Sequence, residues 1–422
     1  MQYNVLIEAF CETYGLGKVR EARLLPTGVA NRTYIVETEL DKYVIKAINP
    51  SRIRTAADLA RIEITEQIAE LANENGIPSI SAKRLNGKIV NELNEQHYIV
   101  FDFFEGKVIR FKKITPENCF KMGGLLADLH QIDFEKKVDL NLDDLLRKHG
   151  VGGHVAFQID WQYYFEKASL EKPKWLGIFE ANLADLYKAI EVTLPSYLSF
   201  IPQDTLISHA DLFSHNVLWK EDEPYIIDWE RSGFIDATYD CLHTAIRWAT
   251  KTPVAENENP LQIERLYAFL NGYTQKRSLN VENVAICLHI ILYNRLNHLK
   301  NHLAKYFNSK DEVSKKQAEK VIKYSLFIVG SYKNLVIDQL EELQQFLMSN
   351  QSNYNDEKSP SYILIPKMKQ LLIHHRSINE SQRITYEKKI SRLNAELAHV
   401  TKWAIGLRIY RKIKSIFKKN RK

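Results

Sequence analysis

The feature that most constrains this chain is a short pair of strands set within a long helical region. Residues 216–219 and 225–227 are rich in apolar and aromatic side chains, and a polar turn joins them. Helical spacing dominates over 117–131 before this hairpin and from 238 to about 349 after it. The sequence therefore predicts a mostly helical region over 105–350 with one small hairpin inside it.

Polar side chains gather at both ends of this hairpin. Because a hairpin returns the chain, Asn216 at its start and Asp228 at its end should converge on one site. Two oxygen ligands there suit Mg²⁺, which usually takes one or two carboxylates plus substrate phosphates. Asp211, on the loop before the hairpin and close to His209, is free to act as a base.

The first hundred residues read as strands around one helix. Strands are expected at 32–38, 42–48, 88–91 and 96–103, where β-branched and aromatic residues are enriched. Helical spacing over 55–75 ends at Gly76 and Pro78, which supply a stop. The sequence therefore predicts a β-β-α-β-β lobe over residues 1–104.

Composition excludes several classes of protein. With 45% hydrophobic and 26% charged residues, the chain is not disordered, collagen-like or a coiled coil alone. Its four cysteines lie far apart, so neither a disulfide framework nor a cysteine zinc site is encoded. No export signal is visible, and the longest apolar run, 284–293, is far shorter than the ~20 residues that cross a bilayer. We expect a cytoplasmic protein, with that run as a buried helix.

The pattern His-x-Asp-x-x-x-x-Asn, followed by an aspartate that ends a strand, resembles the catalytic and metal loops of the protein-kinase-like fold. The variant it resembles is that of aminoglycoside phosphotransferases, choline kinases and bacterial homoserine kinases. The resemblance implies an α+β bilobal fold, with a small antiparallel-sheet N-lobe and a mostly helical C-lobe. It also implies transfer of the γ-phosphoryl group of ATP to an alcohol.

The same resemblance assigns roles to the four polar residues around the hairpin. Asp211 would position and deprotonate the acceptor hydroxyl, and His209 would support its loop. Asn216 and Asp228 would hold Mg²⁺ against the ATP phosphates. Asp240 matches the aspartate that braces the catalytic loop in that fold, and a role as a helix cap is compatible with it.

Lys46 lies in the second strand of the N-terminal lobe, where kinases carry the lysine that contacts the α- and β-phosphates. The alternative is an ordinary solvated lysine on a strand face. Its carboxylate partner is expected on the following helix. Glu66 is the first choice, and Glu63 is the alternative.

Two further nucleotide contacts are implied. The stretch PTGVANRTYIV resembles the glycine-containing turn over the phosphates, with Gly28 and Asn31 in it, although an ordinary turn has much the same sequence. YIVFDFFEG lies where the connection between lobes should be, so the backbone from Asp102 to Phe104 is expected to bind adenine. A plain connection between a strand and a helix has a similar composition.

Departures from protein kinases concern the acceptor. Ala210 replaces the usual arginine, Trp229 and Glu230 replace Phe-Gly, and no activation segment fits between Asp228 and Asp240. A small-molecule acceptor is therefore expected, with a sugar or cell-surface glycan precursor ahead of choline, ethanolamine or homoserine. A catalytically silent structural or coat protein is the rival from another class.

The C-terminal segment carries the net basicity. Its last 22 residues contain nine Lys or Arg and no acid, so the net charge of +6 belongs to this tail and a nucleic-acid-binding body is not favoured. We expect a linker and helix over 351–384 and a short coil with a basic amphipathic helix over 385–422. Residues 386–400 could pair in a homodimer, and residues 401–422 suit an anionic membrane surface at the inner face. Packing on the protein's own body and nucleic-acid binding are the alternatives for this helix.

Overall fold

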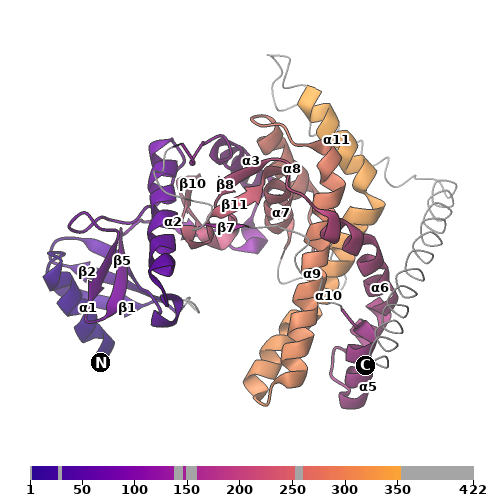
Figure 1. Ribbon diagram of the computed structural model, residues 1–422, viewed down its shortest axis with the longest axis horizontal. Helices are drawn as coiled ribbons and strands as arrows, with labels where there is room; N and C mark the ends of the chain where they lie inside the picture. Colours follow the sequence, from indigo (N-terminus) through magenta and orange to yellow (C-terminus); the bar gives the residue numbers. More distant parts are fainter. Residues whose placement is uncertain (1, 27–30, 137–145, 149–158, 252–259, 353–422) are drawn as a thin grey trace, which may run out of the picture. The chain divides into compact units, whose positions relative to one another are not determined.

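The computed structural model describes residues 2–26, 31–136, 146–148, 159–251 and 260–352, and its two lobes belong to one compact unit, Met1–Asn355 (Figure 1). The N-lobe is built on a five-stranded antiparallel sheet of order β1-β2-β3-β5-β4. The strands are β1 (Val19–Leu24), β2 (Arg32–Thr38), β3 (Lys42–Ala47), β4 (Val90–Leu93) and β5 (Gln96–Asp102). Helices α1 (Gln2–Thr13) and α2 (Ala56–Glu74) pack against this sheet.

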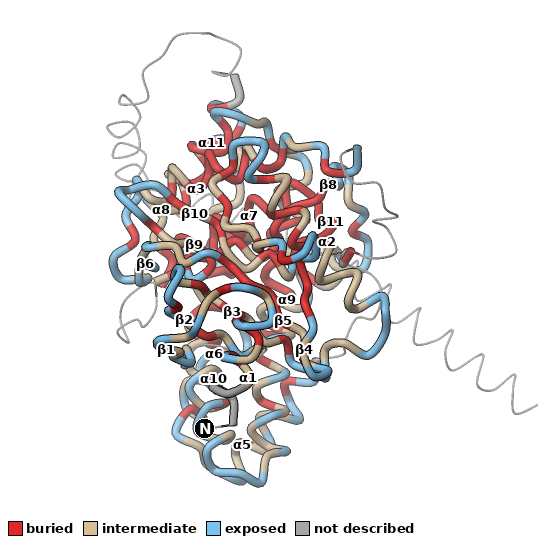
Figure 2. Tube along the Cα trace, turned by 90° about the vertical axis from the view of Figure 1, so that its left-hand side faces the viewer, coloured by how far each residue is buried: buried red, intermediate tan, exposed pale blue. Residues whose placement is uncertain are grey.

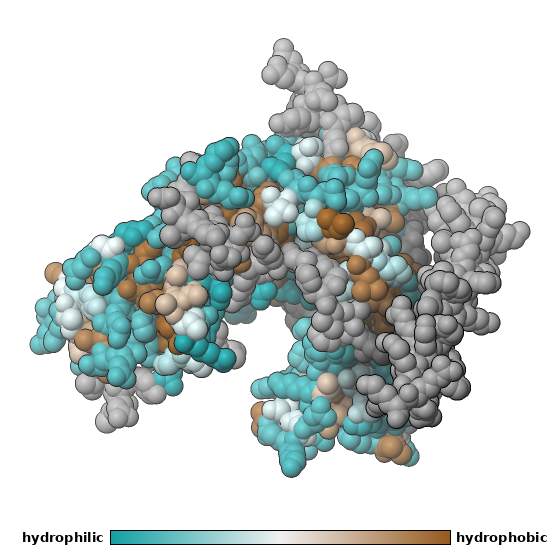
Figure 3. Space-filling view, in the orientation of Figure 1, coloured by the Kyte–Doolittle hydropathy of each residue, from teal (hydrophilic) through white to brown (hydrophobic). Residues whose placement is uncertain are grey.

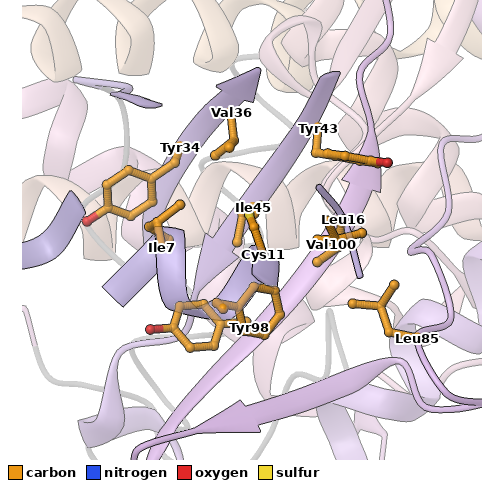
Figure 4. Packing of buried hydrophobic residues seen from close by; sticks show 11 residues of the cluster. Ile7, Cys11, Leu16, Tyr34, Val36, Tyr43, Ile45, Leu85, Tyr98 and Val100 are labelled. Carbon is orange, nitrogen blue, oxygen red and sulfur yellow. The ribbon is translucent and has the colours of Figure 1, made fainter. Parts of the chain in front are cut away.

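Alternating side chains give the sheet two buried faces. Tyr98 and Val100 of β5 belong to the cluster that includes Phe10 of α1, shown in Figure 4. The intervening residues Ile99 and Phe101 belong to a second cluster, against which α2 packs. Because strand side chains alternate between faces, both helices are fixed by the apolar pattern of the strands between them.

The predicted N-lobe is confirmed in its sheet and in its central helix, but it is larger than expected. Thr55 caps α2 in a reciprocal capping box with Asp58, and the helix ends at Glu74, just before Gly76. The prediction of four strands and one helix was wrong because it omitted α1 and β1. Strand β1 has four exposed residues of six, so its sequence lacks the apolar alternation that identifies a strand.

The C-lobe is mostly helical, as predicted. Its long helices are α3 (Pro116–Leu129), α5 (Trp161–Glu171), α6 (Leu176–Ser199), α7 (Ala237–Ala249), α8 (Ile263–Thr274), α9 (Val284–Asn308), α10 (Glu312–Lys333) and α11 (Leu340–Ser352). Short strands form two small sheets, one of order β10-β9-β6 and one of order β7-β11-β8. Their bounds are β6 (Lys107–Val108), β7 (Arg147–Lys148), β8 (Thr205–Ser208), β9 (Val217–Lys220), β10 (Glu223–Ile226) and β11 (Gly233–Asp236). Figure 2 shows buried segments concentrated around α7, β8 and β11, and the apolar run 284–293 is largely buried in α9.

The predicted hairpin is β9-β10. Lys220 pairs with Glu223, so only Glu221 and Asp222 form the turn, and both have a left-handed backbone with φ of 50° and 64°. A two-residue turn of this kind matches the twist of the flanking strands. At the other end, the Ile227 N–H donates to the Asn216 carbonyl over 2.9 Å, which closes the hairpin at its base.

Two glycines allow α3 and α8 to cross closely. A Cβ atom built on Gly123 would lie 1.9 Å from the Phe269 carbonyl oxygen, and one on Gly272 would lie 2.0 Å from the Phe120 carbonyl oxygen. Both obstacles are backbone atoms, so no side chain can move to make room. The crossing positions His130, just after α3, beside Tyr273 of α8, with 2.8 Å between His130 Nδ1 and the Tyr273 hydroxyl.

Several predictions lie outside the described residues. The coil over 386–400, the basic helix over 401–422 and nearly all of the linker and helix over 351–384 fall there, as does Gly28. In the part of the chain that is described, no helix is long and apolar enough to span a membrane. Charged and polar residues cover much of the face in Figure 3.

Replacing Gly272 by alanine should destabilise the C-lobe by about 1–3 kcal/mol or more, because its methyl group would overlap the Phe120 carbonyl. Gly330 of α10 is the matched control, since a Cβ there meets no atom within 4 Å. Gly330→Ala should leave stability unchanged or raise it by about 0.5–1 kcal/mol. Urea unfolding of both variants checks this, and equal midpoints would contradict the close crossing.

Candidate active site

The catalytic-loop aspartate and the hairpin asparagine lie side by side. The Asn216 Nδ2 donates to the Asp211 carbonyl oxygen over 2.9 Å and to Asp211 Oδ2 over 3.4 Å. Asn216 is buried, whereas Asp211 keeps part of its surface exposed. Since Nδ2 points at Asp211, Asn216 Oδ1 is the atom left to face a ligand, and it accepts no hydrogen bond within the described residues.

His209 joins the catalytic loop to the end of the hairpin. Its Nε2 donates to the Ile227 carbonyl over 3.1 Å, and its Nδ1 accepts from the Asp211 N–H over 3.2 Å. These two bonds require a neutral ring with the proton on Nε2. Burial lowers the pKa of His209, which keeps it neutral. His209 is therefore a positioning residue, and Ala210 beside it has a left-handed backbone with φ of 57°.

Asp228 follows the hairpin and pairs with Lys46 across the two lobes. Lys46 Nζ lies 2.8 Å from Asp228 Oδ1. Burial alone would lower the pKa of Lys46, but the Asp228 and Glu66 carboxylates outweigh it and raise that pKa. Burial likewise opposes ionisation of Asp228, and Lys46 more than offsets this, so the pKa of Asp228 is lowered. Both groups are charged near neutral pH.

Glu66 lies near this pair without contacting it directly. The side chain comes from α2, is 3% exposed, and has one oxygen, Oε2, with no hydrogen-bond partner. Burial raises its pKa to about 7, although Lys46 opposes the shift. Glu63, the alternative, is only partly buried. The ion pair expected between Lys46 and α2 is thus replaced by one to Asp228.

Glu230 makes a second connection between the lobes. Its Oε2 accepts from Arg52 Nη1 over 2.7 Å and from Asn31 Nδ2 over 3.2 Å. Asn31 Oδ1 in turn accepts from the Asn49 N–H over 3.2 Å. The residue next to the start of β2 is therefore held to the segment after β10. Sequence reasoning noted Glu230 only as a departure from Phe-Gly, because both partners lie more than 175 residues away.

Several groups in the connection between the lobes already contact other parts of the protein. The Phe103 N–H donates to the Lys42 carbonyl over 2.9 Å, so it is not available to a ligand. Asp102 is exposed and pairs with Lys83 over 3.0 Å. The Phe104 ring packs against Tyr225 of β10, with 4.3 Å between centroids. The Phe104 carbonyl accepts from the Gly106 N–H over 3.0 Å, so the Asp102 backbone and the Phe104 N–H are the groups of the expected adenine-binding segment that remain candidates.

A buried network behind the catalytic loop was not predicted in full. His130 Nε2 lies 3.0 Å from Asp240 Oδ2 and 3.2 Å from Ser208 Oγ. Burial disfavours the charged form of Asp240, but the hydrogen bonds from His130 and Ser208 and the charge of His130 together outweigh it and lower the pKa of Asp240. Asp240 thus acts on Ser208, the residue before His209. The signal that the sequence offered was His130 itself, a histidine in the last turn of the predicted helix 117–131.

Asn216 and Asp228 fit a magnesium ion. Their donor atoms are an amide oxygen and a carboxylate kept ionised by Lys46, which are the hard oxygen ligands that Mg²⁺ prefers. Within the described ranges, no cluster of three or more His, Cys, Asp or Glu residues could hold a metal. The remaining ligands would come from phosphates and water.

Acidification should destabilise the protein through His243. This residue packs between Tyr239 and Phe213, and burial followed by the charges of Arg295 and Arg247 lowers its pKa to about 3. A histidine whose folded pKa lies below the unfolded value contributes stability that is present above about pH 6.5 and is lost below it. Because the ring keeps some exposure, the expected loss from pH 7 to pH 5 is about 1–2 kcal/mol.

His243→Phe keeps an aromatic ring that cannot titrate and serves as the comparison. Urea unfolding at pH 7, 6 and 5 should show a smaller loss of stability in this variant than in the wild type. An identical loss would mean that His243 is not the group responsible.

Comparison with known proteins agrees with this geometry. Residues 21–274 match the model of the phosphotransferase enzyme family. Homoserine kinase of Paramagnetospirillum magneticum is 25% identical over 289 residues, covering 66% of this chain and 79% of the relative. Homoserine kinase of Caulobacter vibrioides is 26% identical over 277 residues, covering 65% and 78%.

Solved structures show the same fold at low sequence identity. A spectinomycin phosphotransferase in complex with ADP and spectinomycin has a TM-score of 0.56 and 16% identity, covering 78% of this chain and 98% of that one. An amicoumacin kinase in complex with AMP-PNP and Ca²⁺ has a TM-score of 0.53 and 13% identity, covering 81% and 100%. Since the family match spans more than half of the sequence, this protein belongs to the phosphotransferase enzyme family.

Proposed function

We propose that this protein is an ATP- and Mg²⁺-dependent kinase that phosphorylates the hydroxyl group of a small amino alcohol or hydroxy amino acid. The observation that carries the proposal is the meeting of Lys46, Asp228, Asn216 and Asp211 around the base of the β9-β10 hairpin. The homoserine kinase relatives favour an amino-bearing acceptor over the sugar or glycan precursor that we expected first.

In the proposed reaction, Asp211 orients the acceptor hydroxyl and takes its proton as the oxygen bonds to the γ-phosphorus. The bond between the γ-phosphorus and the bridging oxygen breaks, and ADP leaves with that electron pair. Lys46 would contact the phosphates, and Asn216 and Asp228 would hold the metal. Bound Mg²⁺ supplies positive charge against the phosphate oxygens. Lys46 and Asp228 neutralise each other in the protein alone, so each would give up this partner in order to hold phosphate or metal.

The proposal predicts different effects for Asp211 and Asp228. Asp211→Asn should lower kcat by about 10²–10⁴-fold while ATP binding persists, because it removes the base. Asp228→Asn should abolish the Mg²⁺ dependence of the thermal shift that ATP produces. Asparagine is chosen because Asp228 has a left-handed backbone, φ 66°, which asparagine tolerates and alanine does not.

Asp222→Asn is the matched control for both variants. Asp222 has a similar backbone, φ 64°, but lies exposed in the hairpin turn, and its replacement should change neither measurement. ADP release in the presence of homoserine or 3-aminopropan-1-ol provides the rate. A silent scaffold would show neither acceptor-dependent ADP release nor a Mg²⁺-dependent shift with ATP.

The Glu230 connection should act on nucleotide binding. Arg52→Gln or Glu230→Gln breaks a half-buried ion pair worth about 1 kcal/mol, so each should raise the KM for ATP about fivefold. The double variant should have a KM for ATP no higher than that of either single variant, because both substitutions remove the same contact. Arg84→Gln removes an ion pair to Glu70 within the N-lobe and should leave that KM unchanged. Additive effects of the two substitutions would exclude a shared contact.

A further inference from the structure

Two arginines whose charges act on each other, one of them beside the catalytic loop, have no acidic partner among the described residues. Arg247 belongs to α7 and Arg295 to α9, and each lies over an aromatic ring. The Arg247 Cζ is 3.8 Å from the centroid of Phe213, and the Arg295 Cζ is 5.7 Å from that of Tyr332. Neither guanidinium forms an ion pair or a side-chain hydrogen bond in the described ranges. A ring face attracts a cation but does not neutralise it.

Hydrogen bonds hold α7 against the catalytic loop. The Trp248 Nε1 donates to the Leu212 carbonyl over 2.9 Å, one residue from Asp211. Phe213, under Arg247, is two residues from Asp211. These contacts place the Arg247 guanidinium close to the carboxylate that would receive the acceptor hydroxyl.

Further hydrogen bonds tie α9 and α10 to the same helix. The Asn294 Nδ2 donates to the Tyr239 hydroxyl over 3.2 Å, which joins α9 to α7 next to Arg295. Tyr332 of α10 lies with its hydroxyl 3.0 Å from Thr250 Oγ1, just past the end of α7. Both arginines are thus supported by a rigid frame of three helices.

The charges around Arg247 and Arg295 are mainly positive. Burial lowers the pKa of Arg247, and the nearby charge of Arg295 lowers it further, whereas Asp211 acts weakly in the other direction. Burial and these two arginines also lower the pKa of His243, and burial, His302 and the same arginines lower the pKa of His298. Asp240, the acid whose charge acts on His243, is already bound to His130. Two like charges held together without a counter-ion are typical of a binding site for an anion.

We propose that Arg247 and Arg295 bind an anionic group of the acceptor, a carboxylate or a phosphate, while its hydroxyl lies at Asp211. This inference rests on the proposed kinase function and narrows its substrate class. A hydroxy amino acid or a phosphorylated alcohol satisfies it. A purely cationic amino alcohol does not, because its ammonium group would face two guanidinium groups.

The test compares acceptors that differ only in the anion. Homoserine is paired with 3-aminopropan-1-ol, which lacks the carboxylate, and glycerol 3-phosphate is paired with glycerol. ADP release should show a kcat/KM at least tenfold higher for the anionic member of one pair. The pair in which this occurs distinguishes a carboxylate from a phosphate.

The variants test whether the two arginines cause the preference. Arg247→Gln and Arg295→Gln should each raise the KM for the anionic acceptor at least tenfold, leave the KM for the neutral glycerol unchanged, and not raise the KM for the cationic 3-aminopropan-1-ol. Arg247→Lys keeps the charge and should retain much of the preference. Arg20→Gln, on the exposed surface of β1, is the matched control and should behave as the wild type.

A binding measurement covers the case in which none of the four compounds is phosphorylated. With AMP-PNP and Mg²⁺ saturating the nucleotide site, inorganic phosphate or homoserine should raise the melting temperature of the wild type more than that of Arg247→Gln. Equal shifts in the two proteins, or turnover with an anion preference that the glutamine variants do not change, would overturn the inference and leave the kinase function standing. Loss of the Mg²⁺-dependent ATP shift itself would instead refute the kinase function.

Discussion

A neutral imidazole at position 209 is the interaction on which the rest of the site depends. It accepts from the Asp211 N–H and donates to the Ile227 carbonyl, so one ring fixes the distance between the loop before the hairpin and the segment after it. Protonation would remove the acceptor at Nδ1 and release Asp211. Burial in the C-lobe disfavours that charged form. The helical core therefore stabilises the site through the protonation state of a single residue.

Two kinds of interaction join the two lobes near the site: backbone hydrogen bonds and ion pairs. Ile226 of β10 donates its N–H to the Pro78 carbonyl over 2.8 Å and accepts from the Ile80 N–H over 2.9 Å. These bonds are insensitive to ligands, whereas the ion pairs of Lys46 with Asp228 and of Arg52 with Glu230 involve groups that can exchange partners. The backbone hydrogen bonds hold β10 to the segment 78–80, and the ion pairs are contacts that a polyanion would rearrange. Glu66, whose Oε2 has no hydrogen-bond partner, is a second carboxylate whose charge acts on Lys46, and it would remain beside Lys46 if Asp228 held a metal.

Local patterns were sufficient for most of the fold. The alternation in β2, β3 and β5, the cap at Thr55 and the polar turn of the hairpin all lie within a few residues of the element that they define. Strand β1 was missed because its residues are mainly exposed, and His130 because its partners are 78 to 143 residues away. The pairing of Lys46 with Asp228 spans 182 residues, and periodicity carries no information over such a separation. The spacing of Asp211, Asn216 and Asp228 drew attention to the right hairpin, but not to the contacts of Asn31 and Arg52 with Glu230.

The cations on the two sides of Asp211 have different partners, carboxylates on one side and aromatic rings on the other, and this difference bears on acceptor specificity. Toward the N-lobe, Lys46 has Asp228 and Arg52 has Glu230 within ion-pair distance, so a bound nucleotide would exchange with an existing partner. Toward α7 and α9, Arg247 and Arg295 have aromatic neighbours in place of acids, so an anion gains their full attraction without displacing anything. A site whose cations already have carboxylate partners discriminates weakly between polyanions, because a new ion pair replaces one of similar free energy. A site of the second kind rejects cations strongly, since like charges in a partly buried environment are poorly screened. The fold is shared with a spectinomycin phosphotransferase and an amicoumacin kinase, and in our proposal the choice of acceptor by this chain rests on side chains from α7 and α9 rather than on the catalytic loop.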